Sequence, residues 1–319
     1  MSQGRTEVLI LNQQDVKGLL DIPDMLDALE RAFVAFSAGK ASVPPRVAAR
    51  AERGLLGVMP GYLPGVALEA KIVSVFPANH EQGRPSHQGL IALFDEDDGT
   101  PLAIMDGIYV TAIRTGGGAA VSARALARKD SRVLTILGAG AQGHSHLATL
   151  PLVREFEEIR IASRNQRRAN DLAAENPRAK VVEKFDDAVK GADVVCCCTD
   201  AREPIIDFSW LKPGAHVTSV GGTFGPEVDP QTIDRARVFV EWRGASENPP
   251  PAGASELQGI PPESLTEMGE VLSGILPGRQ SDDEITVYKS TGHAVEDAAT
   301  ARLVYDRALN QGAGVMVSF

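Results

Sequence analysis

The chain has 319 residues, of which 43% are hydrophobic and 23% charged, and its formal net charge is −10. The length allows two ordinary domains, and a negative charge without any lysine or arginine run excludes nucleic acid and anionic membranes as expected partners. The sequence shows neither a signal peptide nor an apolar stretch long enough to cross a membrane, so we expect a cytoplasmic protein.

The N-terminal third mixes helical and strand-like patterns. Apolar residues at helical spacing predict a capped helix over residues 22–39. Short strand-like runs follow it, at residues 54–64, 66–77 and 89–107. Asp98-Gly99 lies between two apolar stretches of the last run, which predicts a hairpin. Residues 110–128 are predicted to form a long connecting helix.

From Ser131 onward strands and helices alternate, which is typical of a doubly wound parallel sheet. The strand candidates are residues 132–138, 158–163, 180–183, 193–199, 216–221 and 237–242. A Pro-rich segment at 246–254 interrupts the pattern. Residues 284–309 then predict one more strand and a closing helix, which we expect to pack against the N-terminal domain.

Three consecutive cysteines, Cys196 to Cys198, lie within one of these apolar runs. Neighbouring residues of a strand point to opposite faces, and the spacing suits neither a disulfide nor a zinc site. We therefore predict buried thiols in a reducing compartment and no metal site.

A glycine turn follows the strand candidate at 132–138. Gly138, Gly140, Ala141, Gln142 and Gly143 lie in a complete G-x-G-x-x-G pattern between a strand and a helix. This pattern allows a tight turn, close approach of a pyrophosphate and close helix–strand packing. The amide groups at the start of the helix then face the phosphates. The sequence thus predicts a dinucleotide site.

The end of the second strand bears on which dinucleotide binds. An acidic residue usually grips the ribose of NAD there, but this chain has Ser163, Arg164 and Asn165. An arginine can bind a 2′-phosphate, which slightly favours NADPH over NADH. Alternatively, Arg164 stacks on the adenine of either cofactor.

Several longer motifs occur in a specific order: "VPPR" at 43–46, "MPGY" at 59–62, "KIVSVFPAN" at 71–79, "PSHQGLIALFDEDDGTPLAIMDG" at 85–107, "TAIRTGGGAAVSA" at 111–123 and "YKSTGHAVEDAATA" at 288–301. In these the chain resembles the ornithine cyclodeaminase/mu-crystallin family over nearly its whole length. The resemblance implies an α/β fold in which a doubly wound Rossmann domain, residues 119–294, is inserted in a second α/β domain. That second domain, residues 1–118 plus 295–319, would bind substrate and form a homodimer.

The resemblance also implies which residues act on the substrate, an α-amino or α-imino acid. Arg46 and Arg114 would clamp its carboxylate, for which the planar donor fork of arginine is well suited. Lys71 would lie beside the reacting carbon and nitrogen, and neighbouring arginines should lower its pKa. Alternatively, the two arginines are surface or interface cations and Lys71 is a strand-edge residue.

Further candidates lie near the same motifs. Those for substrate binding, which would receive a second polar or acidic group, are Arg84, His87, Gln88 and His293. Those for cofactor binding are Thr115, Thr199, Gly222 and Ser290.

One position separates the activities known in this family. Its cyclodeaminases carry an aspartate after a "VGG" strand end, where this chain has Thr223, although Glu227 or Asp229 could take its place. "PSHQ" is more similar to mu-crystallin and its reductase relatives. We therefore predict an NAD(P)H-dependent reductase of α-imino acids. The alternatives are an amino-acid cyclodeaminase, an enzyme like alanine dehydrogenase and a non-catalytic, crystallin-like binding protein.

Overall fold

The fold is taken from a computed structural model, which describes residues 7–222 and 224–318 apart from the side chains of His80 and Glu81. The chain divides into two compact units. Unit 1 comprises the residues up to Arg114 together with those from Ala294 onward, and unit 2 comprises Thr115–His293. Helix α3 (Gly107–Leu126) begins in unit 1 and ends in unit 2.

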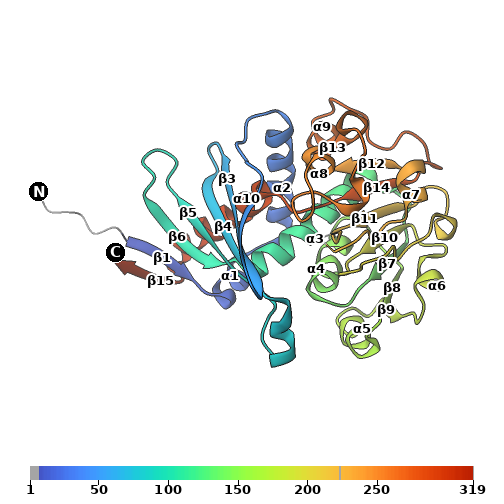
Figure 1. Cartoon of the computed structure of the whole chain (residues 1–319), viewed down its shortest axis with the longest axis horizontal. Helices are drawn as coiled ribbons and strands as arrows, with labels where there is room; N and C mark the ends of the chain where they lie inside the picture. The colour runs from blue at the N-terminus through green and yellow to red at the C-terminus, as the bar shows by residue number, and fades with distance from the viewer. Residues whose placement is uncertain (1–6, 223, 319) are drawn as a thin grey trace, which may run out of the picture. The chain divides into compact units, whose positions relative to one another are not determined.

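Unit 1 is built on a mixed sheet (Figure 1). In spatial order its strands are β15 (Val315–Ser318), β1 (Glu7–Leu11), β6 (Pro101–Asp106), β5 (His87–Phe94), β4 (Ala67–Val75), β3 (Gly54–Leu63) and β2 (Val47–Ala51). Neighbouring strands are antiparallel except β1 and β6. The predicted hairpin is present as β5 and β6.

Helices cover one face of this sheet. They are α1 (Gln13–Leu19), α2 (Ile22–Ser37) and α10 (Ala294–Gln311), and a short 3₁₀ helix, η1 (Pro77–Gln82), joins β4 to β5. Asp21 caps α2 by accepting a hydrogen bond from the amide of Asp24 at 3.0 Å. α10 contacts β3, β4 and β5, and it also packs against α2. The closing helix therefore packs against the N-terminal part of the chain, as expected.

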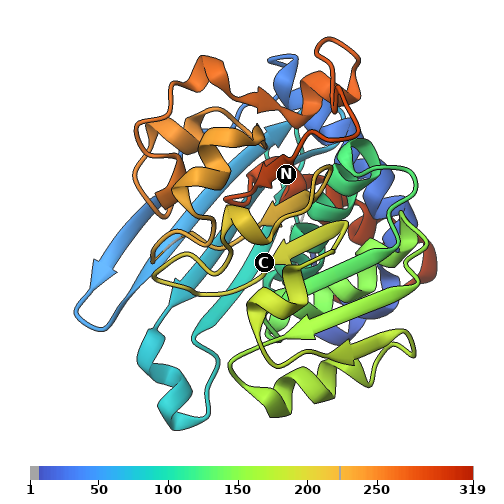
Figure 2. The same ribbon diagram turned by 90° about the vertical axis from the view of Figure 1, so that its right-hand side faces the viewer.

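Unit 2 is a fully parallel sheet with helices on both faces (Figure 2). Its strands in spatial order are β13 (Thr266–Glu267), β12 (Arg237–Val240), β14 (Thr286–Lys289), β11 (His216–Ser219), β10 (Val194–Cys197), β7 (Val133–Leu137), β8 (Glu158–Ala162) and β9 (Ala179–Val181). The order changes direction between β7 and β10, where doubly wound sheets bind ligands beyond the carboxyl ends of their strands. The predicted α/β class with a Rossmann sheet is confirmed.

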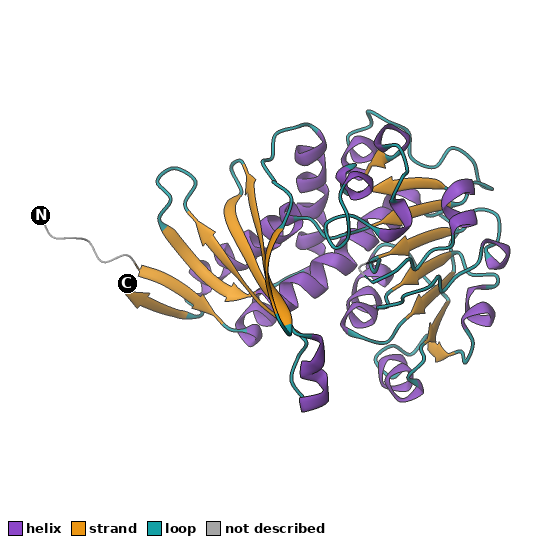
Figure 3. Ribbon diagram, viewed as in Figure 1, coloured by secondary structure: helices purple, strands orange, loops and turns teal. Residues whose placement is uncertain are grey.

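The helices of unit 2, besides the second half of α3, are short. They are α4 (Ala141–Thr149), α5 (Gln166–Ala173), α6 (Phe185–Val189), α7 (Pro230–Arg235), α8 (Gly244–Glu247) and α9 (Met268–Leu272), with 3₁₀ turns at η2 (Leu150–Leu152), η3 (Phe208–Trp210), η4 (Ser255–Leu257) and η5 (Pro262–Ser264). α3 and α4 lie on one face of the sheet, and α6 and α7 lie on the other (Figure 3).

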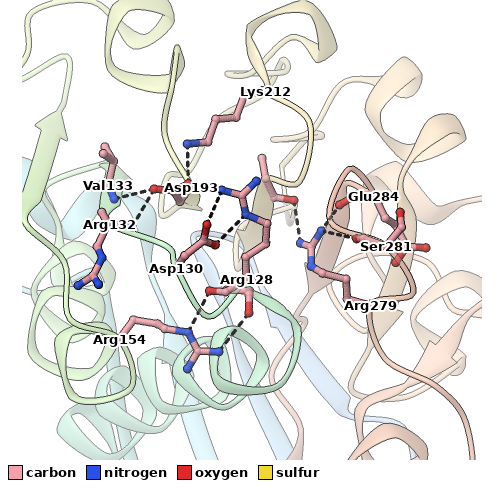
Figure 4. Close-up of polar contacts among 12 residues, drawn as sticks. Arg128, Asp130, Arg132, Val133, Arg154, Asp193, Lys212, Arg279, Ser281 and Glu284 are labelled. Atoms are coloured by element: carbon pink, nitrogen blue, oxygen red, sulfur yellow. Dashed lines mark hydrogen bonds and ion pairs between the residues drawn. The ribbon is translucent and has the colours of Figure 1, made fainter.

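Charged side chains fasten the carboxyl end of α3 to unit 2 (Figure 4). Arg154 donates hydrogen bonds to carbonyl oxygens there, those of Arg124, Ala127 and Arg128. Arg279 donates to the carbonyl oxygen of Leu126 at 2.6 Å. Cations at this end of a helix also interact favourably with its dipole. The network therefore fixes the helix that connects the two units at its unit 2 end.

The three cysteines agree with the sequence analysis. Cys196, Cys197 and Cys198 are all buried and unbridged, and burial raises the pKa of Cys196 to about 12. Within residues 7–222 and 224–318, no helix has the length and apolar character to cross a membrane. No group of histidine, cysteine and acidic residues suited to a metal ion occurs in this same part of the chain.

Candidate active site

The buried centre of unit 1 is an ion-paired cluster formed by β4, α3 and α10. Lys71 Nζ lies 2.7 Å from Asp297 Oδ2, and Arg114 Nε lies 3.0 Å from Asp297 Oδ1. Arg114 Nη1 also lies 3.0 Å from Glu296 Oε2. Lys71 and Arg114 are only 3% and 2% exposed. The alternatives of a strand-edge lysine and a surface Arg114 are therefore excluded.

The electrostatics of the cluster bring the pKa of Lys71 close to neutral pH. Burial and the charge of Arg114 lower the pKa of Lys71 to about 8, although Asp297 opposes them. Arg46 contributes a smaller decrease. Burial alone would raise the pKa of Asp297, but the charges of Arg114 and Lys71 outweigh it and lower that pKa. Such a lysine can give or take a proton near neutral pH.

The acidic partners of Lys71 and Arg114 were missed in the sequence. Glu296 and Asp297 lie in the first turn of α10, where they are fully buried among small residues such as Ala298 and Ala301. Acids favour a helix N-terminus in any case, so their presence in "HAVEDAATA" did not indicate a site. The available signal was the combination of two acids with neighbours small enough for the helix to pack closely.

The other substrate-binding candidates of unit 1 lie on exposed segments. Arg46 is half-buried, immediately before β2, and its charge acts on Lys71. Arg84 and His87 are exposed. Gln88 is paired with Ser74 on β4, which places it on the sheet face opposite to Lys71, because side chains alternate along a strand. The structure thus brings Arg46, Lys71 and Arg114 together, but not Gln88.

The glycine turn of unit 2 has the geometry of a pyrophosphate site. Gly138 has φ +111°, and a Cβ placed on it would lie 2.4 Å from the carbonyl oxygen of Cys198. A Cβ on Gly143 would lie 2.3 Å from the carbonyl oxygen of Gly138. In contrast, a Cβ on Gly140 meets no atom within 4 Å. Two glycines are thus required by packing, and the third faces open space.

The first turn of α4 faces the same space. The helix begins at Ala141 and Gln142, and its N-cap residue, Gly140, provides no side-chain hydrogen bond to the helix amides. These amides suit the phosphates of a dinucleotide, and the open space at Gly140 fits the group. The residues present therefore fit a bound NAD(P).

Alanine substitutions at two of these glycines should have different effects. Gly140→Ala should leave the melting temperature unchanged but weaken NADH or NADPH binding at least about tenfold, because the new methyl group occupies ligand space. Gly143→Ala should instead lower the free energy of unfolding by roughly 1–3 kcal/mol, because its methyl group overlaps the backbone. Thermal melting and fluorescence titration would check this pair. Equal losses of stability in both variants would contradict the assignment.

The adenosine end of the predicted cofactor site is polar and exposed. Asn165 caps α5 by accepting a hydrogen bond from Arg168, and Ser163 accepts one from the amide of Asn165 at 3.3 Å. Arg164 is exposed, and its Nη2 lies 3.1 Å from Asp200 Oδ1. Arg164 is thus accessible at the carboxyl edge of the sheet, beside one acidic residue.

A buried carboxylate holds together the segments that follow β10 and β11 at the carboxyl edge of the sheet. Glu227 accepts hydrogen bonds from the amide and hydroxyl of Thr199, at 2.6 and 2.7 Å, and from the Gly221 amide at 2.7 Å. Asp229 caps α7. Both acids are thus committed to internal hydrogen bonds, which argues against either replacing the cyclodeaminase aspartate. Thr223 itself lies outside the described residues.

Gly222 adjoins another part of this hydrogen-bonded region. It has φ +93°, and a Cβ on it would lie 2.7 Å from Glu256 Oε2 and 2.8 Å from Lys289 Nζ. Glu256 and Lys289 form a buried ion pair at 3.0 Å. The sequence analysis missed this pair as well, because its members come from distant segments.

A second buried carboxylate fixes the loop after β14. Glu241 accepts hydrogen bonds from Ser290 Oγ at 2.5 Å and from the Gly292 amide at 2.9 Å. The ring of His293 lies 5.6 Å from that of Trp242. Thr115, another cofactor candidate, is buried as the first residue of unit 2. Ser290 and His293 thus belong to a loop at the carboxyl edge of the sheet that is held by hydrogen bonds to Glu241.

Comparisons with known proteins agree over the length of the chain. Residues 6–312 match the model of the ornithine cyclodeaminase/mu-crystallin family. The ketimine reductase mu-crystallin of Mus musculus is 37% identical over 291 residues, which are 88% of this chain and 91% of that protein.

Two solved structures have the same fold. Δ1-pyrroline-2-carboxylate reductase of Thermococcus litoralis, in complex with NADH and L-proline, has a TM-score of 0.90 at 34% identity and covers 97% of this chain and 100% of its own. An archaeal alanine dehydrogenase dimer with bound NAD has a TM-score of 0.89 at 31% identity, covering 98% and 99%. These proteins are named as reductases and a dehydrogenase, which is the class expected from the sequence.

Proposed function

Because the chain belongs to the ornithine cyclodeaminase/mu-crystallin family, we propose that it is an NAD(P)H-dependent reductase of α-imino acids. It converts a ketimine, or an imine formed from a 2-oxo acid and an amine, into an L-amino acid. The observation that carries the proposal is buried Lys71, which is paired with Asp297 beside Arg114 and has a pKa of about 8. In this proposal the Rossmann domain predicted over residues 119–294 binds the cofactor, and the rest of the chain binds substrate.

The unit 1 cluster supplies the groups that this reaction needs. Arg46 and Arg114 hold the substrate carboxylate, and Asp297 and Glu296 fix the orientation of the Arg114 guanidinium. Protonated Lys71 donates its proton to the imine nitrogen, because an iminium carbon accepts hydride far more readily than a neutral imine. The reduced nicotinamide, when bound, supplies that hydride. Arg84, His87 and His293 stay candidates for contacts to the substrate side chain, whereas Gln88 does not, because it lies on the sheet face opposite to Lys71.

The test is oxidation of NADPH and NADH by the purified protein with a panel of substrates. The panel contains cyclic ketimine acids, pyruvate or oxaloacetate with ammonia, and pyruvate with methylamine. Rapid oxidation with one imine supports the proposal, and its absence with every imine contradicts it. The preferred imine would also identify the substrate side chain.

The same assay separates the alternative functions. Ammonia release from ornithine without net cofactor oxidation would indicate a cyclodeaminase. Reversible conversion of alanine to pyruvate would indicate an enzyme like alanine dehydrogenase. A non-catalytic binding protein would turn over none of these compounds, and the buried Lys71, Arg114 and Asp297 argue against it, because binding alone needs no lysine that titrates near neutral pH.

We propose a modest preference for NADPH over NADH. Arg164 is accessible to a 2′-phosphate, although nearby Asp200 partly offsets its charge. Arg164→Ala should therefore raise KM for NADPH about tenfold, the value of one charge-assisted contact, while KM for NADH changes little. Asp200→Ala is the matched control and should lower KM for NADPH. An equal increase of both KM values in R164A would indicate stacking on adenine instead.

We also propose that the protein is a homodimer, as the archaeal alanine dehydrogenase is. The sheet face of unit 1 opposite to α10 carries Leu56 and Leu90, which are 48% and 37% exposed, and half-buried Ile72 and Phe94. Large exposed apolar side chains on one sheet face mark a surface that binds another protein, although Ser74 and Gln88 on the same face are polar. Light scattering should give twice the chain mass of 33.9 kDa. Leu90→Asp should shift it toward the monomer, whereas a monomeric wild-type protein would refute the proposal.

A further inference from the structure

Glu69 is a buried acid of unit 1 to which the proposed reaction gives no role. It lies two residues before Lys71 on β4, so the two side chains share the face of the sheet that α10 covers. Glu69 is 2% exposed, and neither of its carboxylate oxygens has a hydrogen-bond partner. A Cβ placed on Gly61 would lie 3.1 Å from Oε1 and 2.9 Å from the Ala294 Cβ. The carboxyl group is thus enclosed between β3 and α10.

Its surroundings disfavour the ionised form. Burial raises the pKa of Glu69 well above its usual value, and the charge of Asp297 raises it further, whereas Lys71 and Arg114 lower it. The residues paired with Glu69 on the neighbouring strands are Gly61 and Leu93, which carry no charge. A buried carboxylate without hydrogen-bond donors is strongly unfavourable unless it takes up a proton.

The proton on Glu69 determines the net charge of the cluster. Lys71 and Arg114 balance Glu296 and Asp297, so the four ion-paired groups are neutral together. Arg46 adds a positive charge close enough to act on Lys71. With Glu69 protonated, the cluster therefore has one net positive charge, whereas an ionised Glu69 would cancel it.

We propose that Glu69 keeps its proton when ligand is bound and so makes the cluster specific for a ligand group with a single negative charge. The inference rests on the proposed function insofar as that ligand group is the carboxylate of an imino or 2-oxo acid. In the free protein Lys71 and Arg114 stabilise an ionised fraction of Glu69, so binding of the anion is coupled to uptake of a proton by Glu69. Affinity for the anion then falls as the pH rises through the titration of Glu69.

The experiment is calorimetric titration of the full-length protein, saturated with oxidised cofactor, with pyruvate. Pyruvate carries one carboxylate and no titrating nitrogen, and no hydride is available to reduce it. Titrations from pH 6 to 9, in buffers with different heats of ionisation, give the affinity and the number of protons taken up. The proteins are wild type, Glu69→Gln and Glu52→Gln, the last an exposed control in unit 1.

In wild type and E52Q we expect binding to take up protons and the affinity for pyruvate to fall as the pH rises. The decrease in affinity between pH 6 and pH 9 should be about tenfold or more larger than the decrease in E69Q. E69Q should keep only the titration of Lys71. Equal proton uptake and equal pH dependence in wild type and E69Q would overturn the inference.

If E69Q does not fold, wild type is compared with His87→Gln and His293→Gln. At pH 7 a lysine with a pKa of about 8 is already about nine-tenths protonated, so Lys71 can take up only about a tenth of a proton. Greater uptake that persists in both histidine variants supports the role of Glu69, and uptake that is lost in either variant or does not exceed this tenth refutes it. If pyruvate does not bind at all, the carboxylate clamp is wrong and the proposed function falls with it. Binding without the added proton uptake overturns the inference alone.

Discussion

Lys71→Arg is expected to lower kcat for imine reduction about 10²–10⁴-fold while leaving the protein folded. Arginine keeps the positive charge and can still pair with Asp297, but it cannot release a proton near neutral pH. The variant therefore removes proton transfer and preserves the ion pair at 2.7 Å. Steady-state kinetics with the preferred imine and thermal melting provide the two measurements.

The pH profile distinguishes a proton donor from a structural lysine. The protonated form of Lys71 is the active one, and its pKa is about 8. In wild type kcat at saturating imine, where Glu69 keeps its proton, should therefore be constant at neutral pH and fall tenfold per unit above pH 8. In Lys71→Arg the residual activity should lack this alkaline decrease. If Lys71→Arg retained both the activity and the decrease at alkaline pH, Lys71 would not be the proton donor.

The sequence predicted those parts of the fold that depend on local patterns. The glycine turn at Gly138 and the alternation of strands and helices after it identified the parallel sheet, because both signals lie within short segments. The helix predicted at residues 22–39 is present as Ile22–Ser37. Strands β1, β2, β13 and β15 were missed. Every residue of β2 and β15 is exposed, so neither has the alternation of buried and exposed residues that marks a strand.

The candidate site shows which contacts a sequence pattern cannot predict. Lys71 and Arg114 were identified by the resemblance of their motifs to the family, and their residue types suit carboxylate and imine chemistry. Their buried partner Asp297 is 226 residues from Lys71 along the chain, and no local pattern reports such a contact. The expected decrease in the pKa of Lys71 is present, but burial is a larger cause than the neighbouring arginine. Its magnitude therefore depends on how closely α10 packs against the sheet, which the sequence does not reveal.

Asp297→Asn is the substitution in this cluster that should affect both stability and the pH profile. Asp297 holds Lys71 and Arg114 together, so its loss leaves two buried cations with Glu296 alone. Removing one partner of a buried ion pair costs about 3–5 kcal/mol of the free energy of unfolding. Asp297 also raises the pKa of Lys71, through its charge and its hydrogen bond. Without it, that pKa should fall below 8 by about one unit or more.

In D297N the decrease of kcat at alkaline pH should therefore begin at lower pH, with a loss of at least about fivefold in kcat at pH 8. Glu296→Gln is the matched control, because Glu296 pairs with Arg114 and is not one of the main causes of the shift in the pKa of Lys71. E296Q should be less stable than wild type, but its kcat should decrease at the same alkaline pH. Chemical denaturation and pH-dependent kinetics on both variants provide the comparison. If D297N and E296Q showed the same pH profile, the contact between Asp297 and Lys71 would not control the proton that the reaction uses.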